Sequence, residues 1–218
     1  NPTSTTITTL TRAITGLPSG VTIEGIDFRP VNGQLHALGN NGVLYGINLS
    51  NGAAAMISTL NVSLSGTSFG VDFNPVADRL RIVSNSAQNL RVNVTTGVTI
   101  VDGTLTPASG TPFVNGAAYT NSFAGTTATV LYDIDSQNNK LYKQDPPNAG
   151  GLQEIGNLGV MIEAANGFDI GGTSGTAYAL LTVGGTTGLY TINLTTGAAT
   201  KTANFPAAVK GFALGFGL

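Results

Sequence analysis

Three aspartates recur at one position of a repeated motif. Asp27, Asp72 and Asp169 each follow a glycine by two residues, in the sequences Gly-Ile-Asp, Gly-Val-Asp and Gly-Phe-Asp. Carboxylates that converge on a central channel could bind a cation or a sugar. An aspartate in a tight inner strand can instead accept hydrogen bonds from backbone N–H groups. The three residues are therefore candidates for a channel site, with a structural role as the alternative.

A second group of oxygen-bearing side chains lies in the segment 132–139, Tyr-Asp-Ile-Asp-Ser-Gln-Asn-Asn. Its oxygen atoms fall at alternate positions, and hard cations such as calcium prefer oxygen ligands. Asp133, Asp135 and Asn138 are therefore candidate metal ligands. The segment lacks the glycine and the distal glutamate of a helix–loop–helix calcium site, so a polar hairpin loop is the competing interpretation.

Catalytic constellations are not visible in the chain. His36 is the only histidine, no Gly-x-Ser-x-Gly motif occurs, and cysteine is absent. A Ser-His-Asp triad would have to use His36, which has no nucleophile motif beside it. A carboxylate pair for glycoside hydrolysis would draw on only 11 acidic residues,. We predict no catalytic residues and no cofactor.

Four asparagines begin N-glycosylation sequons: Asn48, Asn61, Asn93 and Asn193,. Three of them share one repeat position just before a turn, so turn chemistry explains them without a modification.

Four charged residues also cluster in a charge-poor chain: Asp78, Arg79, Arg81 and Arg91. An Asp–Arg pair within or between subunits, or a solvated edge, would account for that cluster.

The composition narrows the class of protein. Charged residues make up 9% of the 218 residues and the net charge is −2. The chain has no basic patch that could hold a phosphate backbone, so we expect it not to bind nucleic acid. No apolar run approaches the roughly 18 residues that a membrane span needs. A surface rich in Thr, Ser, Asn and Gly is typical of an extracellular or cell-surface protein, which is the predicted location.

These residues sit in a repeat with a period of about 45, which is typical of propeller blades. Each unit contains four short strands, with an Asn-Gly or Thr-Gly pair between the third and fourth. The lead motifs occur at 25–28, 70–73, 116–119 and 167–170, and a fifth begins at 211–214. The pattern predicts an all-β fold, a small β-propeller of about five four-stranded blades with one incomplete. A β-sandwich with accidental self-similarity is the alternative.

The N-terminal segment 1–15 is rich in threonine and precedes a single propeller domain over 16–218. Thr5, Ile7, Thr9 and Leu10 favour an extended strand. Ile7 and Leu10 are three apart, so a bulge would be needed to place them on one face. The strand could close its own propeller or complete the deficient blade of a neighbouring copy. A head-to-tail contact of the second kind builds a ring or a helical filament.

The stretch 70–84, Gly-Val-Asp-Phe-Asn-Pro-Val-Ala-Asp-Arg-Leu-Arg-Ile-Val-Ser, resembles bacterial secreted proteins grouped as domain of unknown function family 4394. Further matching segments are 88–91, 117–121, 141–147, 167–170 and 189–197. The resemblance covers 16–218 and implies an exported, propeller-like β-domain without established catalytic residues. It places the threonine-rich N-terminus outside the matching region.

Three functions follow as hypotheses. The leading one is a structural subunit of an extracellular bacterial filament or surface assembly, whose partners are copies of itself joined by the N-terminal strand. The second is a monomeric module that binds carbohydrate or another small ligand through exposed aromatic rings, with Tyr45, Tyr142 and Tyr190 as candidates. The third is a propeller hydrolase that uses Asp27, Asp72 and Asp169.

Overall fold

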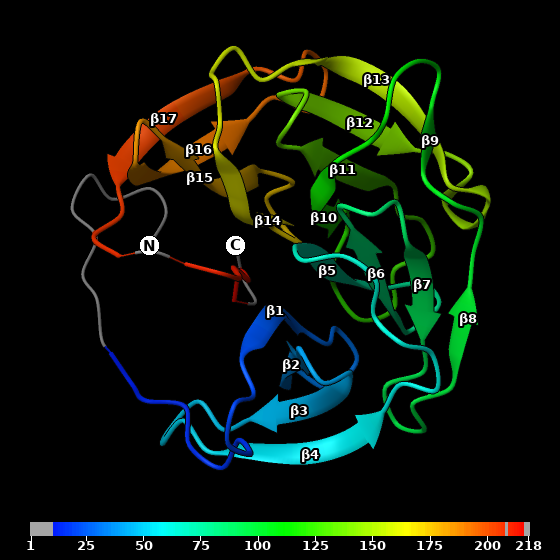
Figure 1. Cartoon of the computed structure of the whole chain (residues 1–218), viewed down its shortest axis with the longest axis vertical. Helices are drawn as coiled ribbons and strands as arrows, with labels where there is room; N and C mark the ends of the chain where they lie inside the picture. Colours follow the sequence, from blue (N-terminus) through cyan, green and yellow to red (C-terminus); the bar gives the residue numbers. More distant parts are fainter. Residues whose placement is uncertain (1–10, 208, 216–218) are drawn as a thin grey trace.

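A computed structural model of the chain describes residues 11–207 and 209–215. Its strands form four sheets arranged around a common axis, as Figure 1 shows. In each sheet four strands form an antiparallel meander that starts at the axis and runs toward the rim, and one sheet has a fifth strand that pairs in parallel at its outer edge. This is the architecture of a β-propeller, so the predicted class is confirmed.

The first two blades have four strands each. Blade 1 comprises β1 (Ile23–Phe28), β2 (Leu35–Gly39), β3 (Val43–Ile47) and β4 (Ala54–Thr59). Blade 2 comprises β5 (Phe69–Asn74), β6 (Arg79–Ser84), β7 (Asn89–Val92) and β8 (Thr99–Val101).

The other two blades differ in one strand. Blade 3 comprises β10 (Val114–Tyr119), β11 (Leu131–Asp135), β12 (Lys140–Gln144) and β13 (Gly151–Asn157), with the 3-10 turn η1 (Pro147–Ala149) before β13. The short β9 (Thr106–Pro107) pairs in parallel with β13 as a fifth strand. Blade 4 comprises β14 (Ala164–Ile170), β15 (Ala177–Val183), β16 (Thr186–Ile192) and β17 (Ala199–Asn204).

The predicted number of blades is wrong: the structure contains four blades, one of them five-stranded, rather than five. The reason lies at the C-terminus, where the fifth lead motif, 211–214, reaches the axis. No strand among the described residues follows it or pairs with it.

Turn chemistry shapes the rim. Gly52, Gly97 and Gly197 lie between the third and fourth strands of their blades and have φ of 77°, 76° and 83°. This left-handed conformation favours glycine, which is why the Asn-Gly and Thr-Gly pairs recur there. The blades pack face to face on apolar side chains, such as Leu38 of blade 1 on Phe73 of blade 2. No helix among the described residues is long and apolar enough to cross a membrane.

Candidate functional site

The three repeated aspartates meet at the axis. Asp27, Asp72 and Asp169 lie in the innermost strands β1, β5 and β14, and each is buried. Each offers a carboxylate oxygen within 4.8 Å of those of the other two. The sequence-predicted channel residues are therefore brought together, and among the described residues they form a group of carboxylates that could hold a metal ion.

Each carboxylate also joins its blade to the next one. Asp27 accepts a hydrogen bond from the Phe73 N–H at 2.7 Å, and Asp72 accepts one from the Tyr119 N–H at 3.0 Å. Asp169 accepts one from the Leu214 N–H at 2.6 Å, which fastens the C-terminal segment to blade 4. Buried backbone donors need such partners, so these bonds support the structural interpretation of the aspartates.

Two lead segments carry alanine at the aspartate position, Ala118 in blade 3 and Ala213 near the C-terminus. The side chain of an alanine cannot accept a hydrogen bond from the next N–H around the axis, which is that of Ile170 after Ala118 and that of Phe28 after Ala213,. Each is capped by the aspartate before it in the chain, at 2.6 Å for Ile170 and 2.7 Å for Phe28. The second oxygens of Asp169 and Asp27 thus replace the missing carboxylates.

Burial sets the protonation of this group. Burial, together with the neighbouring Asp169 carboxylate, raises the pKa of Asp27 well above its usual value. The pKa of Asp72 is raised well above its usual value by burial and by both other carboxylates. Burial raises the pKa of Asp169 to about 7, against its two backbone hydrogen bonds. Burial thus favours the protonated forms of these carboxyl groups and disfavours an ionised nucleophile.

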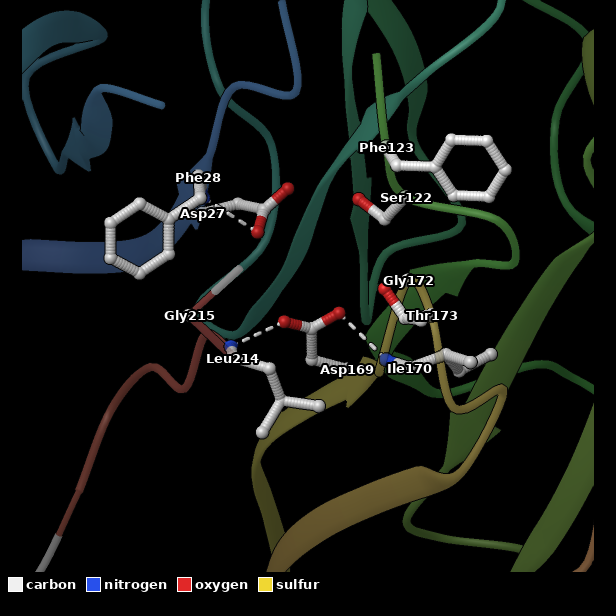
Figure 2. A pocket seen from close by; sticks show the side chains of 10 residues that line it. All are labelled: Asp27, Phe28, Ser122, Phe123, Asp169, Ile170, Gly172, Thr173, Leu214 and Gly215. Atoms are coloured by element: carbon white, nitrogen blue, oxygen red, sulfur yellow. Dashed lines mark hydrogen bonds between the residues drawn. The ribbon is translucent and has the colours of Figure 1, made fainter. Parts of the chain in front are cut away.

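A cavity of about 110 Å³ opens beside this cluster. Figure 2 shows the carboxylates of Asp27 and Asp169 beside Ser122 and Phe123, with Leu214 on the other side. Phe123 is 43% exposed, so the cavity has one accessible aromatic ring.

The C-terminal segment occupies the inner position of a fifth blade. A side chain at Gly25, Gly70, Gly116 or Gly167 would press on the next lead segment, at Val71, Ala117, Phe168 or Phe212 respectively. A side chain at Gly211 would in turn press on Ile26 of β1. The five glycines form a closed cycle around the axis, and residues 211–214 are its fifth member.

The start of the described chain occupies the outer end of the same position. Gly97, in the rim turn of blade 2, packs against the Thr59 carbonyl at the end of β4 in blade 1. Gly52, in the rim turn of blade 1, packs against the Ala13 carbonyl in the same way. Ala13 therefore stands where the outer strand of a blade before blade 1 would end. Thr15 then pairs in parallel with Ala53.

Apolar faces border this position on both sides. Blade 1 contributes Ala37, Tyr45 and Ile47, with Leu17 and Val21 packed against them. Blade 4 contributes a cluster whose buried members are Tyr178, Leu180 and Leu189. Among the described residues, no strand fills the second or third place between these faces.

Two of the three candidate metal ligands of blade 3, Asp135 and Asn138, hydrogen-bond to each other. Asp135 accepts hydrogen bonds from the backbone N–H groups of Phe113, Gln137 and Asn138 and from the Asn138 side chain. Asp133 is fully buried and has no partner for either oxygen among the described residues. The bonds around Asp135 favour the polar-hairpin interpretation.

The remaining candidates have structural contacts. Asn48, Asn93 and Asn193 each accept a hydrogen bond from the N–H two residues on, as turn residues do,. Asn61 instead accepts one from the Thr99 N–H. Thr5, Ile7, Thr9 and Leu10 lie outside the described residues.

The aromatic and charged candidates are also accounted for. Tyr45, Tyr142 and Tyr190 are buried, so they offer no exposed ring for a ligand. His36 packs edge-on against Phe73. Asp78 pairs with Arg29, whereas Arg81 and Arg91 both pair with Asp102, which the sequence did not single out. Arg79 donates to the backbone carbonyls of Ala77 and Asp78.

Fold and site together define a β-propeller whose axial carboxylates join blade to blade and whose fifth blade position is only partly filled by the residues that the structure describes. The chain belongs to the family described as "Domain of unknown function (DUF4394)", whose model matches residues 1–213. The match includes the N-terminal segment, which corrects the boundary at residue 16 that the resemblance suggested. A comparison with curated proteins finds no match.

Solved structures share the fold. A protein of unknown function from Bacteroides thetaiotaomicron is 18% identical, with a TM-score of 0.55 over 77% of this chain and 44% of that one. The Dos1 propeller is 13% identical, with a TM-score of 0.50 over 87% and 48% of the two chains. Hydrazine synthase of Kuenenia stuttgartiensis is 12% identical, with a TM-score of 0.53 over 88% and 50%. The chain spans about half the length of these structures, and identities this low show the fold alone.

Proposed function

We propose that this protein is a structural subunit of an extracellular bacterial filament or surface assembly. The N-terminal strand of one copy enters the fifth blade position of the next. The observation that carries the proposal is that residues 11–207 and 209–215 fill this position only in part. The position has an inner segment at 211–214, an outer end at Ala13 and apolar walls on blades 1 and 4.

Strand addition suits this position for a physical reason. An inner segment without a neighbouring strand leaves backbone N–H and C=O groups to be paired, and an incoming strand pairs them. The donor and the acceptor are different surfaces of one chain, so each copy can bind one neighbour on each side. Such a contact propagates into a filament unless its rotation closes a ring.

Complementation between two variants tests the proposal. A chain lacking residues 1–10 keeps the acceptor and loses the donor. The variant Ile47→Asp puts a charge on the blade 1 wall and keeps the donor, and Leu189→Asp does the same on the blade 4 wall. Circular dichroism and thermal melting verify that each variant is folded.

Electron microscopy and light scattering should show filaments of the full chain and monomers of each variant alone. A mixture of the truncated chain with Ile47→Asp should give one-to-one heterodimers, because one donor and one acceptor remain. A full-length chain that stays monomeric at high concentration would refute the proposal.

The axial cavity supports a second candidate, a module that binds a small ligand such as a carbohydrate. Its exposed Phe123 ring and the hydroxyls of Ser122 and Thr173 are groups that sugars contact,. Glycan-array binding by the full chain that is lost in Phe123→Ala would support this function. An array without any bound glycan would count against it.

A further inference from the structure

The axial aspartates offer more hydrogen-bond acceptors than the surrounding backbone uses. Their three carboxylates carry six oxygens, and five of these accept one backbone N–H each. The donors are one N–H from each of the five lead segments, those of Phe28, Phe73, Tyr119, Ile170 and Leu214. The sixth oxygen is Asp72 Oδ2, which accepts no hydrogen bond from the described residues although Asp72 is only 1% exposed. Backbone pairing therefore leaves one buried oxygen for another partner.

The cluster also has no positive partner in the described part of the chain. No lysine or arginine there forms an ion pair with Asp27, Asp72 or Asp169. The neighbouring charges that shift the pKa of Asp27 and of Asp72 are other carboxylates, and they raise it. Buried carboxylates are stable as ions when a positive group pairs with them or when they coordinate a metal. A bound cation would supply the missing charge.

The geometry allows one ion to contact all three aspartates. Each of them offers an oxygen within 4.8 Å of those of the other two. Three points no more than 4.8 Å apart fit in a circle of radius 4.8/√3, so one position lies within about 2.8 Å of all three oxygens, close to the calcium–oxygen distance of about 2.3–2.6 Å,. A carboxylate oxygen has two lone pairs, so an oxygen that accepts an N–H can also contact an ion.

We infer that Asp27, Asp72 and Asp169 bind one calcium ion on the axis of the propeller. Carboxylate oxygens suit calcium and magnesium better than softer metals. Magnesium demands a near-ideal octahedron at about 2.0–2.1 Å, whereas calcium accepts irregular geometry. Calcium fits better here, because hydrogen bonds to the backbone already fix the three carboxylates in place.

The neighbouring cavity supplies what the aspartates lack. Calcium takes about six to eight oxygen ligands, more than three aspartates provide when each contributes one oxygen. The cavity of about 110 Å³ is lined by Asp27, Asp169, Ser122 and Thr173, so it gives an ion a route from solvent and has room for water ligands,.

An ion at this place would hold the ring together. Asp27, Asp72 and Asp169 lie in the inner strands of blades 1, 2 and 4, and Asp169 also holds the Leu214 N–H. These ligands are far apart in the unfolded chain, so calcium would bind the folded state and stabilise it by mass action. Protons and calcium compete for the same oxygens, and metal binding favours the ionised forms. The inference uses a single copy of the chain and does not depend on the proposed assembly.

Calcium titration of the chelator-treated full chain, at a fixed protein concentration, tests the site. Calorimetry should show one ion bound per chain. Calcium at a hundred times its dissociation constant should raise the melting midpoint by about 5–10 °C. Crystals grown with calcium should show an ion within about 2.3–2.6 Å of an oxygen of each aspartate. An equal shift with magnesium would overturn the assignment to calcium.

Two matched variants locate the binding. Asp72→Asn removes a charge and keeps Oδ1 as an acceptor for the Tyr119 N–H, so it should fold and bind calcium at least about tenfold more weakly,. Asp133→Asn changes a buried aspartate outside the cluster and should keep the full affinity. Circular dichroism verifies that both variants are folded.

The opposite result would overturn the inference, with binding lost in Asp133→Asn and kept in Asp72→Asn, because the ion would then lie in blade 3. A full chain whose melting midpoint and heat of titration do not respond to about 10 mM calcium would overturn it as well.

Discussion

Asp133 is a buried acid without a hydrogen-bond partner among the described residues, in the face of blade 3 that packs against blade 2. Burial raises the pKa of Asp133 to about 8, although the positive charge of Arg81 lowers it. Gln144 lies on the neighbouring strand, and its Oε1 also has no partner among the described residues. A protonated Asp133 avoids a buried charge, so the folded state holds a proton that the unfolded chain releases near pH 4.

The sign of the pH dependence follows from this difference. Between about pH 4 and about pH 8 the folded state binds the extra proton, so Asp133 makes unfolding easier as the pH rises,. In Asp133→Asn the free energy of unfolding should fall less steeply as the pH rises, by up to about 1.4 kcal/mol per pH unit. Urea unfolding from pH 5 to pH 8 measures it, with Asp145→Asn as control, at a partly exposed aspartate that pairs with Lys143. Equal slopes in the native chain and Asp133→Asn would contradict the buried-proton account.

The axial carboxylates differ in how many backbone groups they hold. Asp169→Ala leaves the N–H groups of Ile170 and Leu214 without partners, whereas Asp72→Ala leaves only that of Tyr119. We expect Asp169→Ala to cost about 2–4 kcal/mol and Asp72→Ala about 1–3 kcal/mol of unfolding free energy. Hydrogen exchange should accelerate at the Leu214 amide in Asp169→Ala alone. Unchanged protection of that amide would show that other contacts hold the C-terminal segment.

At the scale of elements, the inner strands depend on close approach at their glycines. A methyl group on Gly70 would lie 2.7 Å from the Ala117 backbone nitrogen, which cannot move away without shifting β10. A methyl group on Gly116 would lie 3.2 Å from the Phe168 Cβ, a contact that a small shift relieves. The inner strands differ in sequence, but each has a glycine where it approaches the next lead segment most closely. This close contact sets the distance between neighbouring blades.

This difference predicts unequal costs for one chemical change. Gly70→Ala should lower the unfolding free energy by about 2–3 kcal/mol, because backbone must move to relieve the overlap. Gly116→Ala is the matched control in the neighbouring strand and should cost less than about 1 kcal/mol. Chemical denaturation of both variants measures the costs. Similar losses would indicate that the inner strands adjust more freely than their packing suggests.

In the molecule as a whole, the C-terminal segment closes the ring at the axis, and the described residues fill the fifth position only in part farther from the axis. A strand supplied by a neighbour would bind the folded state and not the unfolded chain, which stabilises the fold by mass action. The stability of the full chain should then depend on protein concentration.

Thermal melting at several concentrations tests this dependence. Above the dissociation constant, a tenfold increase adds about 1.4 kcal/mol, which for a chain of this size raises the midpoint by about 3–5 °C. The chain lacking residues 1–10 should melt at a lower temperature, with a midpoint independent of concentration. A concentration-independent midpoint in the full chain would argue that its N-terminus closes its own ring.

The sequence by itself determined the local and repeating features. The spacing of the Gly-x-Asp motifs and the recurring Asn-Gly and Thr-Gly turns predicted an all-β propeller and placed Asp27, Asp72 and Asp169 at equivalent positions. These features follow from strand and turn preferences within one unit, so a single chain displays them. The partly filled last repeat was visible as well, because its lead motif begins at Gly211.

Only the tertiary structure decided how the units meet. It reduced the five predicted blades to four, buried Tyr45, Tyr142 and Tyr190, and showed that Asp133 has no partner among the described residues. It also revealed that the two alanine positions are compensated by Asp27 and Asp169, and that Ala13 and Gly211 belong to one fifth blade position. Such relations depend on contacts between residues about 45 or more positions apart, which no local pattern in the chain encodes.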